Sequence, residues 1–114
     1  MDNYDYQALV NEVVRRGINM FGNFEDWTKG AFAFADLGEK GRSMFKAISS
    51  ISDKYREKVN DYKFSHALRT RGRITIASFI YMCKQHGIDT NKYYVRMKPL
   101  PFRIALQRLI ALQR

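Results

Sequence analysis

Hydrophobic residues at the start of the chain recur at the spacing of an amphipathic helix. Apolar positions fall every three or four residues over residues 4–20, at Tyr6, Leu9, Val10, Val13 and Val14. This is the period of one helix face. Arg15 and Arg16 lie near the end of the pattern, where the helix dipole favours cations. The spacing predicts a first helix over residues 4–20, ended by Gly22.

A second helix is predicted to start at Asn23, whose side chain suits the N-cap position. Its apolar stripe comprises Trp27, Ala31, Phe34 and Ala35. Gly30 inside this helix costs about 1 kcal/mol relative to alanine, and a close approach of another helix would explain it. Trp27 has the spacing of a core residue, although an indole can also serve as a platform for base stacking.

Two further helices follow in the middle of the chain. The third is defined by Gly41, Met44, Phe45 and Ile48 and ends at a serine-rich turn over residues 49–52. We expect Asp53 to cap a fourth helix that runs to about Leu68. Its predicted inward positions are Tyr55, Val59 and Tyr62.

A fifth helix is predicted over residues 75–86. The Thr75 hydroxyl can cap its start, and Gly87 can end it in a left-handed conformation. Its apolar face comprises Ile76, Phe79, Ile80 and Cys83. Cys83 is therefore expected to be a buried structural thiol and not a nucleophile.

The last part of the chain is less regular. Residues 92–98 combine β-branched and aromatic side chains, so they suit either a short strand or a short helix. Pro99 and Pro101 end whatever precedes them, and a last helix is predicted from Phe102 to Arg114. We expect an all-α fold, a compact bundle of five or six helices in one domain over residues 1–114.

The distribution of charge separates the two halves of the chain. Residues 1–62 hold 9 Lys/Arg and 10 Asp/Glu, whereas residues 63–114 hold 11 Lys/Arg and 1 Asp/Glu. Nearly all of the net charge of +9 therefore lies in the second half. Such asymmetry predicts a polyanionic partner, most simply nucleic acid.

The densest basic stretch, Arg69-Thr70-Arg71-Gly72-Arg73, holds three arginines in five residues. We predict that it binds nucleic-acid phosphates, because flexible surface cations give affinity without sequence choice. Interleaved tyrosines can stack on unpaired bases. The candidate nucleic-acid-binding residues are Arg69, Arg71, Arg73, Lys84, Lys92, Tyr93, Tyr94, Arg96 and Lys98.

Residues for catalysis are missing from the sequence. His66 and His86 are the only histidines, and no cysteine pair or acidic cluster completes a metal site with them. No phosphate-binding glycine-rich loop is present, and the dispersed carboxylates do not suit a two-metal centre. We therefore expect a non-enzymatic protein with no catalytic residue, metal or cofactor.

Several short motifs follow one another in a distinctive order. They are Phe24-Glu25-Asp26-Trp27, Ser52-Asp53-Lys54-Tyr55, Lys63-Phe64 and Gly72-Arg73-Ile74-Thr75-Ile76. Over residues 23–89 this order resembles the primase C-terminal type-2 domain, a small helical domain found beside primase or helicase modules in phage, plasmid and mobile-element replication proteins. Phe24 and Phe64 stand where the family more often has tyrosine and tryptophan, and both keep an aromatic ring.

The resemblance implies a place in DNA replication or in a mobile element, and a primase or helicase as a protein partner. One helix precedes the motifs, with no primase or helicase module on either side, so we expect a stand-alone or excised copy. A single cysteine, no secretory signal and no apolar run of about 20 residues predict a cytoplasmic protein without a membrane span.

Two other functions fit the sequence. In a helix-turn-helix regulator, residues 75–86 would form the first helix and residues 90–98 a recognition helix carrying Asn91, Lys92 and Arg96. In a protein-interaction module, residues 102–113 would form a homodimer or dock on a replication protein through Leu106, Leu109 and Ile110.

Overall fold

Five α-helices and two short 3-10 helices form the part of the chain that the computed structural model describes, residues 4–95. They are α1 (Tyr6–Arg16), α2 (Phe24–Ala35), η1 (Gly38–Lys40), α3 (Gly41–Ser49), α4 (Glu57–Thr70), α5 (Ala77–Gln85) and η2 (Thr90–Tyr93). The predicted all-α bundle is confirmed. The helix expected at residues 102–114 lies outside the described residues.

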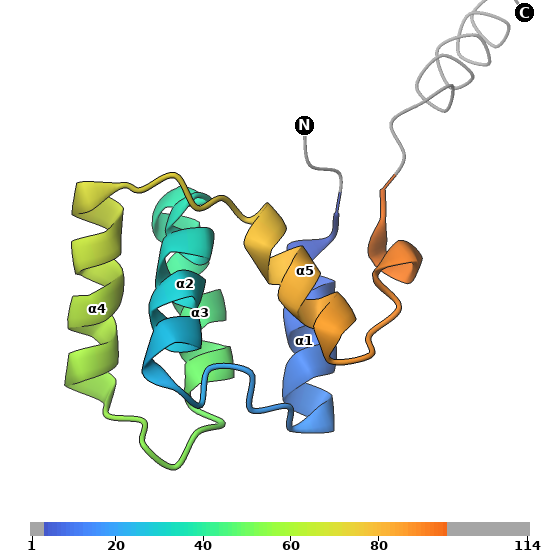
Figure 1. The fold of residues 1–114 in the computed structure, drawn as a ribbon, viewed down its shortest axis with the longest axis horizontal. Coiled ribbons are helices and arrows are strands. Elements are labelled where there is room, and N and C mark those ends of the chain that lie inside the picture. The colour runs from blue at the N-terminus through green and yellow to red at the C-terminus, as the bar shows by residue number, and fades with distance from the viewer. Residues whose placement is uncertain (1–3, 96–114) are drawn as a thin grey trace, which may run out of the picture.

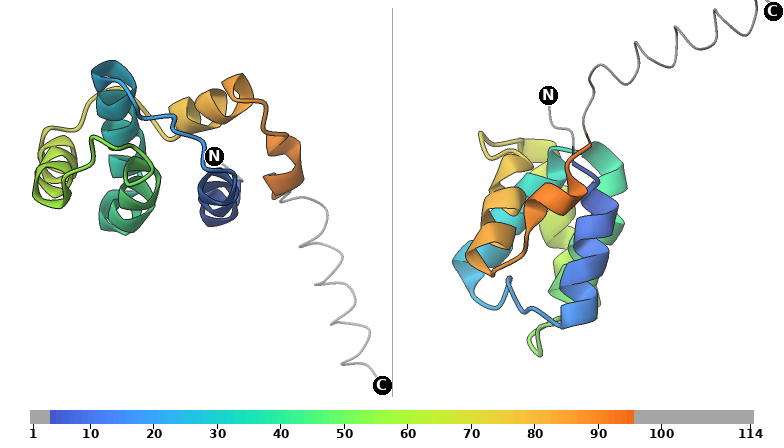
Figure 2. Two further views of the ribbon diagram at one scale, coloured as in Figure 1. Left: turned by 90° about the horizontal axis from the view of Figure 1, so that it is seen from below. Right: turned by 90° about the vertical axis from the view of Figure 1, so that its right-hand side faces the viewer.

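The helix α2 lies in the middle of the bundle, where it packs against α3, α4 and α5 (Figure 1). On one side α4 forms the edge of the molecule. On the other side α3 also packs against α1, and η2 packs against both α1 and α5 (Figure 2). Tyr4 and Tyr94 form an isolated antiparallel bridge, so the two ends of the described chain lie side by side.

The predicted cap of the second helix is confirmed, whereas the predicted ends of the first helix are not. The Asn23 side chain accepts a hydrogen bond from the Asp26 backbone N–H at 2.8 Å, as expected for the cap of α2. The first helix, however, is shorter than predicted. It begins after Asp5, whose carboxylate accepts from the Ala8 N–H at 3.1 Å, and it ends at Gly17, where φ is +66°.

The start of α5 is capped by two side chains, one of which comes from a distant part of the sequence. The N-cap position is Ile76, one residue after the predicted Thr75, but the Thr75 hydroxyl still accepts from the Ala77 N–H at 3.3 Å. The Asp36 carboxylate, at the end of α2, accepts from the Ile76 N–H at 2.9 Å. Asp36 therefore ties two helices together by satisfying an N–H that the helix itself leaves unpaired. Gly87 ends α5 with φ of +81°, as predicted.

The predicted start and inward face of α4 are wrong. The helix begins at Glu57, and its buried residues are Asn60, Phe64 and Ala67. Val59 and Tyr62 are instead exposed, while Asp53 lies in the preceding turn and does not cap the helix. The apolar pattern misled because a polar residue, Asn60, occupies an inward position.

Aromatic rings join the helices in the core. The rings of Phe34 and Phe79 lie 4.7 Å apart between α2 and α5. A second series links Phe21, Phe45 and Phe64, with centroids 5.7 Å and 5.9 Å apart. Such tilted pairs stabilise a core beyond the area that they bury.

Phe21 also explains Gly30, although not by the expected approach of another helix. The Phe21 ring comes from the connection between α1 and α2, and a Cβ on Gly30 would lie 2.4 Å from that ring. Glycine at position 30 therefore leaves the space that the Phe21 ring occupies.

Gly41 offers the sharpest test of the packing. A Cβ at this position would lie 2.1 Å from the backbone oxygen of Phe34, and backbone at the centre of the bundle cannot move aside. We expect Gly41→Ala to lower the free energy of unfolding by about 2 kcal/mol or more, as overpacked cores do, measured by urea denaturation.

Gly72→Ala is the matched control. Its added Cβ would lie 3.4 Å from the Phe32 ring, which is ordinary contact, so we expect a change within about 0.5 kcal/mol. Equal losses in the two variants would contradict the packing assigned to Gly41.

A buried carboxylate holds η2 against α1. Glu12 is 2% exposed, accepts a hydrogen bond from the Tyr93 hydroxyl and pairs with Arg16. The hydrogen bond from Tyr93, and then the charge of Arg16, lower the pKa of Glu12 despite its burial. The same hydrogen bond raises the pKa of Tyr93.

These two shifts predict the pH dependence of stability. The pKa of Glu12 in the folded state lies below its ordinary value of 4.5, so its contribution is complete above that pH and is lost as the pH falls through the lowered pKa. Tyr93 has the opposite sign: its contribution is complete below 10.0 and is lost as the pH rises through the raised pKa. Urea denaturation of Tyr93→Phe should show a weaker dependence at both ends, and an unchanged profile would contradict the coupling.

Candidate nucleic-acid interface

The predicted arginine cluster lies at one end of the edge helix. Arg69 belongs to the last turn of α4, and Arg71 and Arg73 follow in the connection to α5, which passes α2 on its way (Figure 1). All three side chains are exposed. Arg71 has φ of +48°, a conformation that residues with a side chain seldom adopt, and its N–H donates to the Ala67 carbonyl at 2.9 Å. The chain therefore turns sharply within the cluster.

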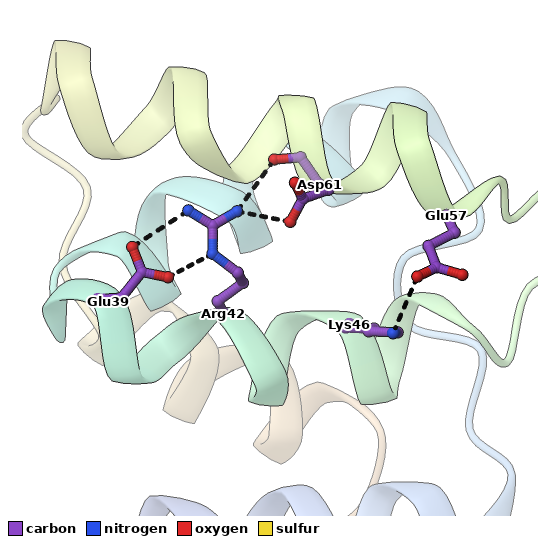
Figure 3. A network of polar contacts seen from close by, with 5 residues as sticks. All are labelled: Glu39, Arg42, Lys46, Glu57 and Asp61. Carbon is purple, nitrogen blue, oxygen red and sulfur yellow. Dashed lines mark hydrogen bonds and ion pairs between the residues drawn. The ribbon is translucent and has the colours of Figure 1, made fainter.

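Two other arginines of the bundle, Arg16 and Arg42, form ion pairs. Arg42 is held between α3 and α4 by two carboxylates (Figure 3): its Nη1 lies 2.6 Å from the Asp61 Oδ1, and its Nη2 lies 3.2 Å from the Glu39 Oε1. These partners raise the pKa of Arg42, and its guanidinium lies 4.9 Å from the centroid of the Phe64 ring. A second ion pair between α3 and α4 joins the Lys46 Nζ and the Glu57 Oε2 at 3.4 Å. Arg42 therefore joins helices.

The arginine cluster differs from Arg16 and Arg42 in having no acidic partner in the described part of the chain. Arg16 and Arg42 pair with carboxylates, whereas none of Arg69, Arg71 and Arg73 forms an ion pair with any residue between 4 and 95. Unpaired, exposed guanidiniums are suited to bidentate contacts with phosphate oxygens. The cluster is therefore available to a ligand, whereas Arg16 and Arg42 are engaged within the fold.

The remaining predicted residues are more dispersed. Lys84 is exposed in the last turn of α5, which spans about 13 Å from the connection that carries the cluster. Lys92 is exposed on η2, with its Nζ 5.9 Å from the centroid of the Tyr93 ring. Arg96 and Lys98 lie outside the described residues.

The two predicted stacking tyrosines have different surroundings. Tyr93 packs against the core and donates its hydroxyl to Glu12, so its ring is engaged within the protein. Tyr94 is exposed, with its ring edge-on to Tyr4 at 5.2 Å. Only Tyr94 keeps a ring that is accessible to a base.

The described residues do not form the recognition helix of the helix-turn-helix alternative. Thr90–Tyr93 is a single 3-10 turn, and Tyr94 is extended and bridged to Tyr4. The continuous helix expected from residue 90 is therefore broken at Tyr94, which removes the main support for that alternative. The tail helix of the third alternative lies outside the described residues.

A second cluster, absent from the residues predicted above, lies beside the N-terminal half of α4. The Nζ of Lys63 lies 4.3 Å from the centroid of the Phe24 ring and 4.7 Å from that of the Trp27 ring. The two rings are 6.0 Å apart and inclined at 64°. Burial lowers the pKa of Lys63, and this ammonium has no acidic partner among residues 4–95.

A pocket of about 290 Å³ lies beside this cluster, between the N-terminal ends of α2 and α4 and the turn after α3. Its base is fixed by Asn60, whose Oδ1 accepts from the Trp27 indole N–H at 2.8 Å. Its rim carries Lys54, whose Nζ donates to the Gly22 carbonyl at 3.1 Å. Two buried hydroxyls that line it, of Ser49 and Tyr55, have no hydrogen-bond partner within the described chain.

Removal of the Asn60 side chain tests how much its hydrogen bond to Trp27 contributes to stability. Asn60→Ala leaves the Trp27 indole N–H unpaired and is expected to cost about 1–3 kcal/mol. Urea denaturation measures the loss. Emission of Trp27, the single tryptophan of the chain, should shift to the red as water enters. An unchanged stability would show that the bond contributes nothing to the fold.

Neither a metal centre nor a membrane span is found in the part of the chain that the structure describes. Residues 4–95 contain no group of three His, Cys, Asp or Glu side chains placed to hold a metal ion. None of their helices is long and apolar enough to cross a bilayer. Cys83 is buried as predicted, and burial raises the pKa of its thiol to about 12.

Comparison with protein families gives the identity of the domain. The family model described as Primase C terminal 2 (PriCT-2) matches residues 13–83. No curated protein and no solved structure matches the chain. Two of the motifs that pointed to this family in the sequence meet in space, since Phe24, Trp27, Lys54 and Tyr55 all line the pocket. The chain belongs to the Primase C terminal 2 family and is a primase-associated, replication-related domain.

Proposed function

We propose that this domain is a non-enzymatic accessory module of DNA replication that binds DNA phosphates through Arg69, Arg71 and Arg73. The observation that carries the proposal is the contrast between these exposed arginines, which have no acidic partner within residues 4–95, and the ion-paired Arg42. A guanidinium that is already neutralised loses a carboxylate when it binds a phosphate, whereas an unpaired one loses only solvent and counterions.

The proposed surface continues along the second half of the chain through Lys84, Lys92 and Tyr94. The two lysines are exposed and contribute long-range attraction and phosphate contacts. Tyr94 contributes stacking on an unpaired base, which favours single strands over duplex. Tyr93 is left out because its hydroxyl is bound to Glu12. Phosphate contacts without a helix placed in the major groove favour binding that is independent of sequence.

Fluorescence anisotropy with a labelled single-stranded oligonucleotide over a range of salt tests the proposal. Each phosphate contact to a single strand contributes about 0.7 to the slope of log affinity against log salt. The affinity of an Arg69/Arg71/Arg73→Ala variant at low salt should therefore fall by a factor of about ten or more. The magnitude of its slope should be smaller by about 2. Duplex of the same sequence should bind less tightly than the single strand.

A variant with the same change of net charge serves as the control. Arg15, Lys29 and Lys40 are exposed cations on other parts of the bundle, and their replacement by alanine should leave most of the affinity and the slope in place. If both triple variants lose affinity equally, the attraction is only general charge and the proposed surface is wrong. If the folded wild type does not bind at low salt, DNA binding itself is refuted.

A further inference from the structure

We propose that the pocket between the N-terminal ends of α2 and α4 is a docking site for an acidic peptide segment of another replication protein, which inserts a large apolar side chain. The inference goes beyond the proposed function, because it assigns a second partner to a second surface. The two surfaces lie at opposite ends of α4, whose 14 residues span about 20 Å. Each can therefore be disabled without touching the other.

Apolar side chains around the pocket are exposed to an extent that the fold alone does not explain. Phe24 is 69% exposed and Val59 is 55% exposed, and both line the pocket together with Phe21 and Trp27. Large apolar side chains that cluster at a concave site are typical of the anchoring pockets of protein interfaces. A volume of about 290 Å³ accommodates one leucine or aromatic side chain.

The charge of the pocket selects an acidic segment. Among residues 4–95, its charged lining residues are Lys54 and Arg56, and none of the lining residues is a carboxylate. Lys63 adds a third cation beside the Phe24 and Trp27 rings. This ammonium is partly desolvated and unpaired within the described chain, so a carboxylate from a partner would gain a strong, partly shielded interaction.

Two buried polar groups await a partner inside the pocket. Ser49 is 3% exposed, and its hydroxyl and that of Tyr55 have no hydrogen-bond partner among the described residues. Buried hydroxyls are normally satisfied, because an unmet hydrogen bond is costly. A peptide backbone carries N–H and C=O groups that can form hydrogen bonds with both hydroxyls when its side chain enters the pocket.

The arrangement of the rings favours a peptide over a nucleobase. A base stacks in a slot between parallel faces or on an open ring face. Phe24 and Trp27 are inclined at 64°, and the Lys63 ammonium already lies over both rings. The remaining wall includes the aliphatic Val59, which suits another apolar side chain.

A selection from a library of random peptides displayed on phage tests the inference on the full chain. Peptides that bind wild type should be depleted against Val59→Asp, which places a carboxylate at the exposed wall of the pocket. We expect the remaining sequences to combine a leucine or aromatic residue with flanking aspartates or glutamates. A synthetic peptide of such a sequence should change Trp27 emission on binding and bind Val59→Asp at least tenfold more weakly, as expected for a central interface residue.

Matched variants separate docking from folding and from charge. Val14→Asp makes the same change at an exposed valine of α1 and should leave peptide binding intact, with circular dichroism as the check that each variant folds. Lys63→Gln should weaken peptide binding. Single-stranded DNA should bind wild type and Val59→Asp with equal affinity. The arginine triple variant should bind the peptide normally, so failure of one proposal is distinguishable from failure of the other.

Three results would overturn the inference. The first is a selection without pocket-dependent sequences, and the second is pocket-dependent sequences that lack acidic residues. The third is an oligothymidylate that changes Trp27 emission and loses this effect in Val59→Asp, because the pocket would then hold a nucleobase.

Discussion

The packing of α2 at the centre of the bundle is the constraint on which the other features depend. Its buried face must be covered by three helices at once, and Gly41 allows one of them to start directly against the Phe34 carbonyl. The Phe34–Phe79 contact fixes α5, and Asp36 caps the start of that helix. Because α2 is enclosed along its length, its N-terminal end is where its aromatic side chains, Phe24 and Trp27, meet the surface.

The edge helix α4 contributes to two separate surfaces, one at each of its ends. Its inward residues hold the fold, through Phe64 in the core and Asn60 on the Trp27 indole. Its N-terminal end completes a cation-lined apolar pocket, and its C-terminal end delivers the arginine cluster. A small domain that binds DNA at one end of a helix and a protein at the other would connect a replication protein to its template, in keeping with membership of a primase-associated family.

Periodicity and capping residues predicted the helices and the fold class, because amphipathic spacing and an Asn23 cap are local properties. The face of α4 was missed because an inward asparagine and an outward valine reverse the usual polarity, and the reason lies in a tryptophan 33 positions away. The exposure of the arginines agrees with the prediction from sequence, but their lack of acidic partners within residues 4–95 depends on where Glu39 and Asp61 lie in space. The pocket joins two sequence motifs, around Trp27 and around Lys54, which spacing alone does not bring together.

Backbone amide NMR during a titration with single-stranded oligothymidylate tests most directly whether the two surfaces are separate, since each residue reports separately. Chemical shifts are expected to move at residues 69–73 and around Lys84, with a magnitude that falls as salt is raised. Amides of Phe24, Ser49 and Val59 should stay in place, as should the indole N–H of Trp27. Shifts that centre on the pocket, or that leave residues 69–73 unmoved while DNA binds, would contradict this expectation.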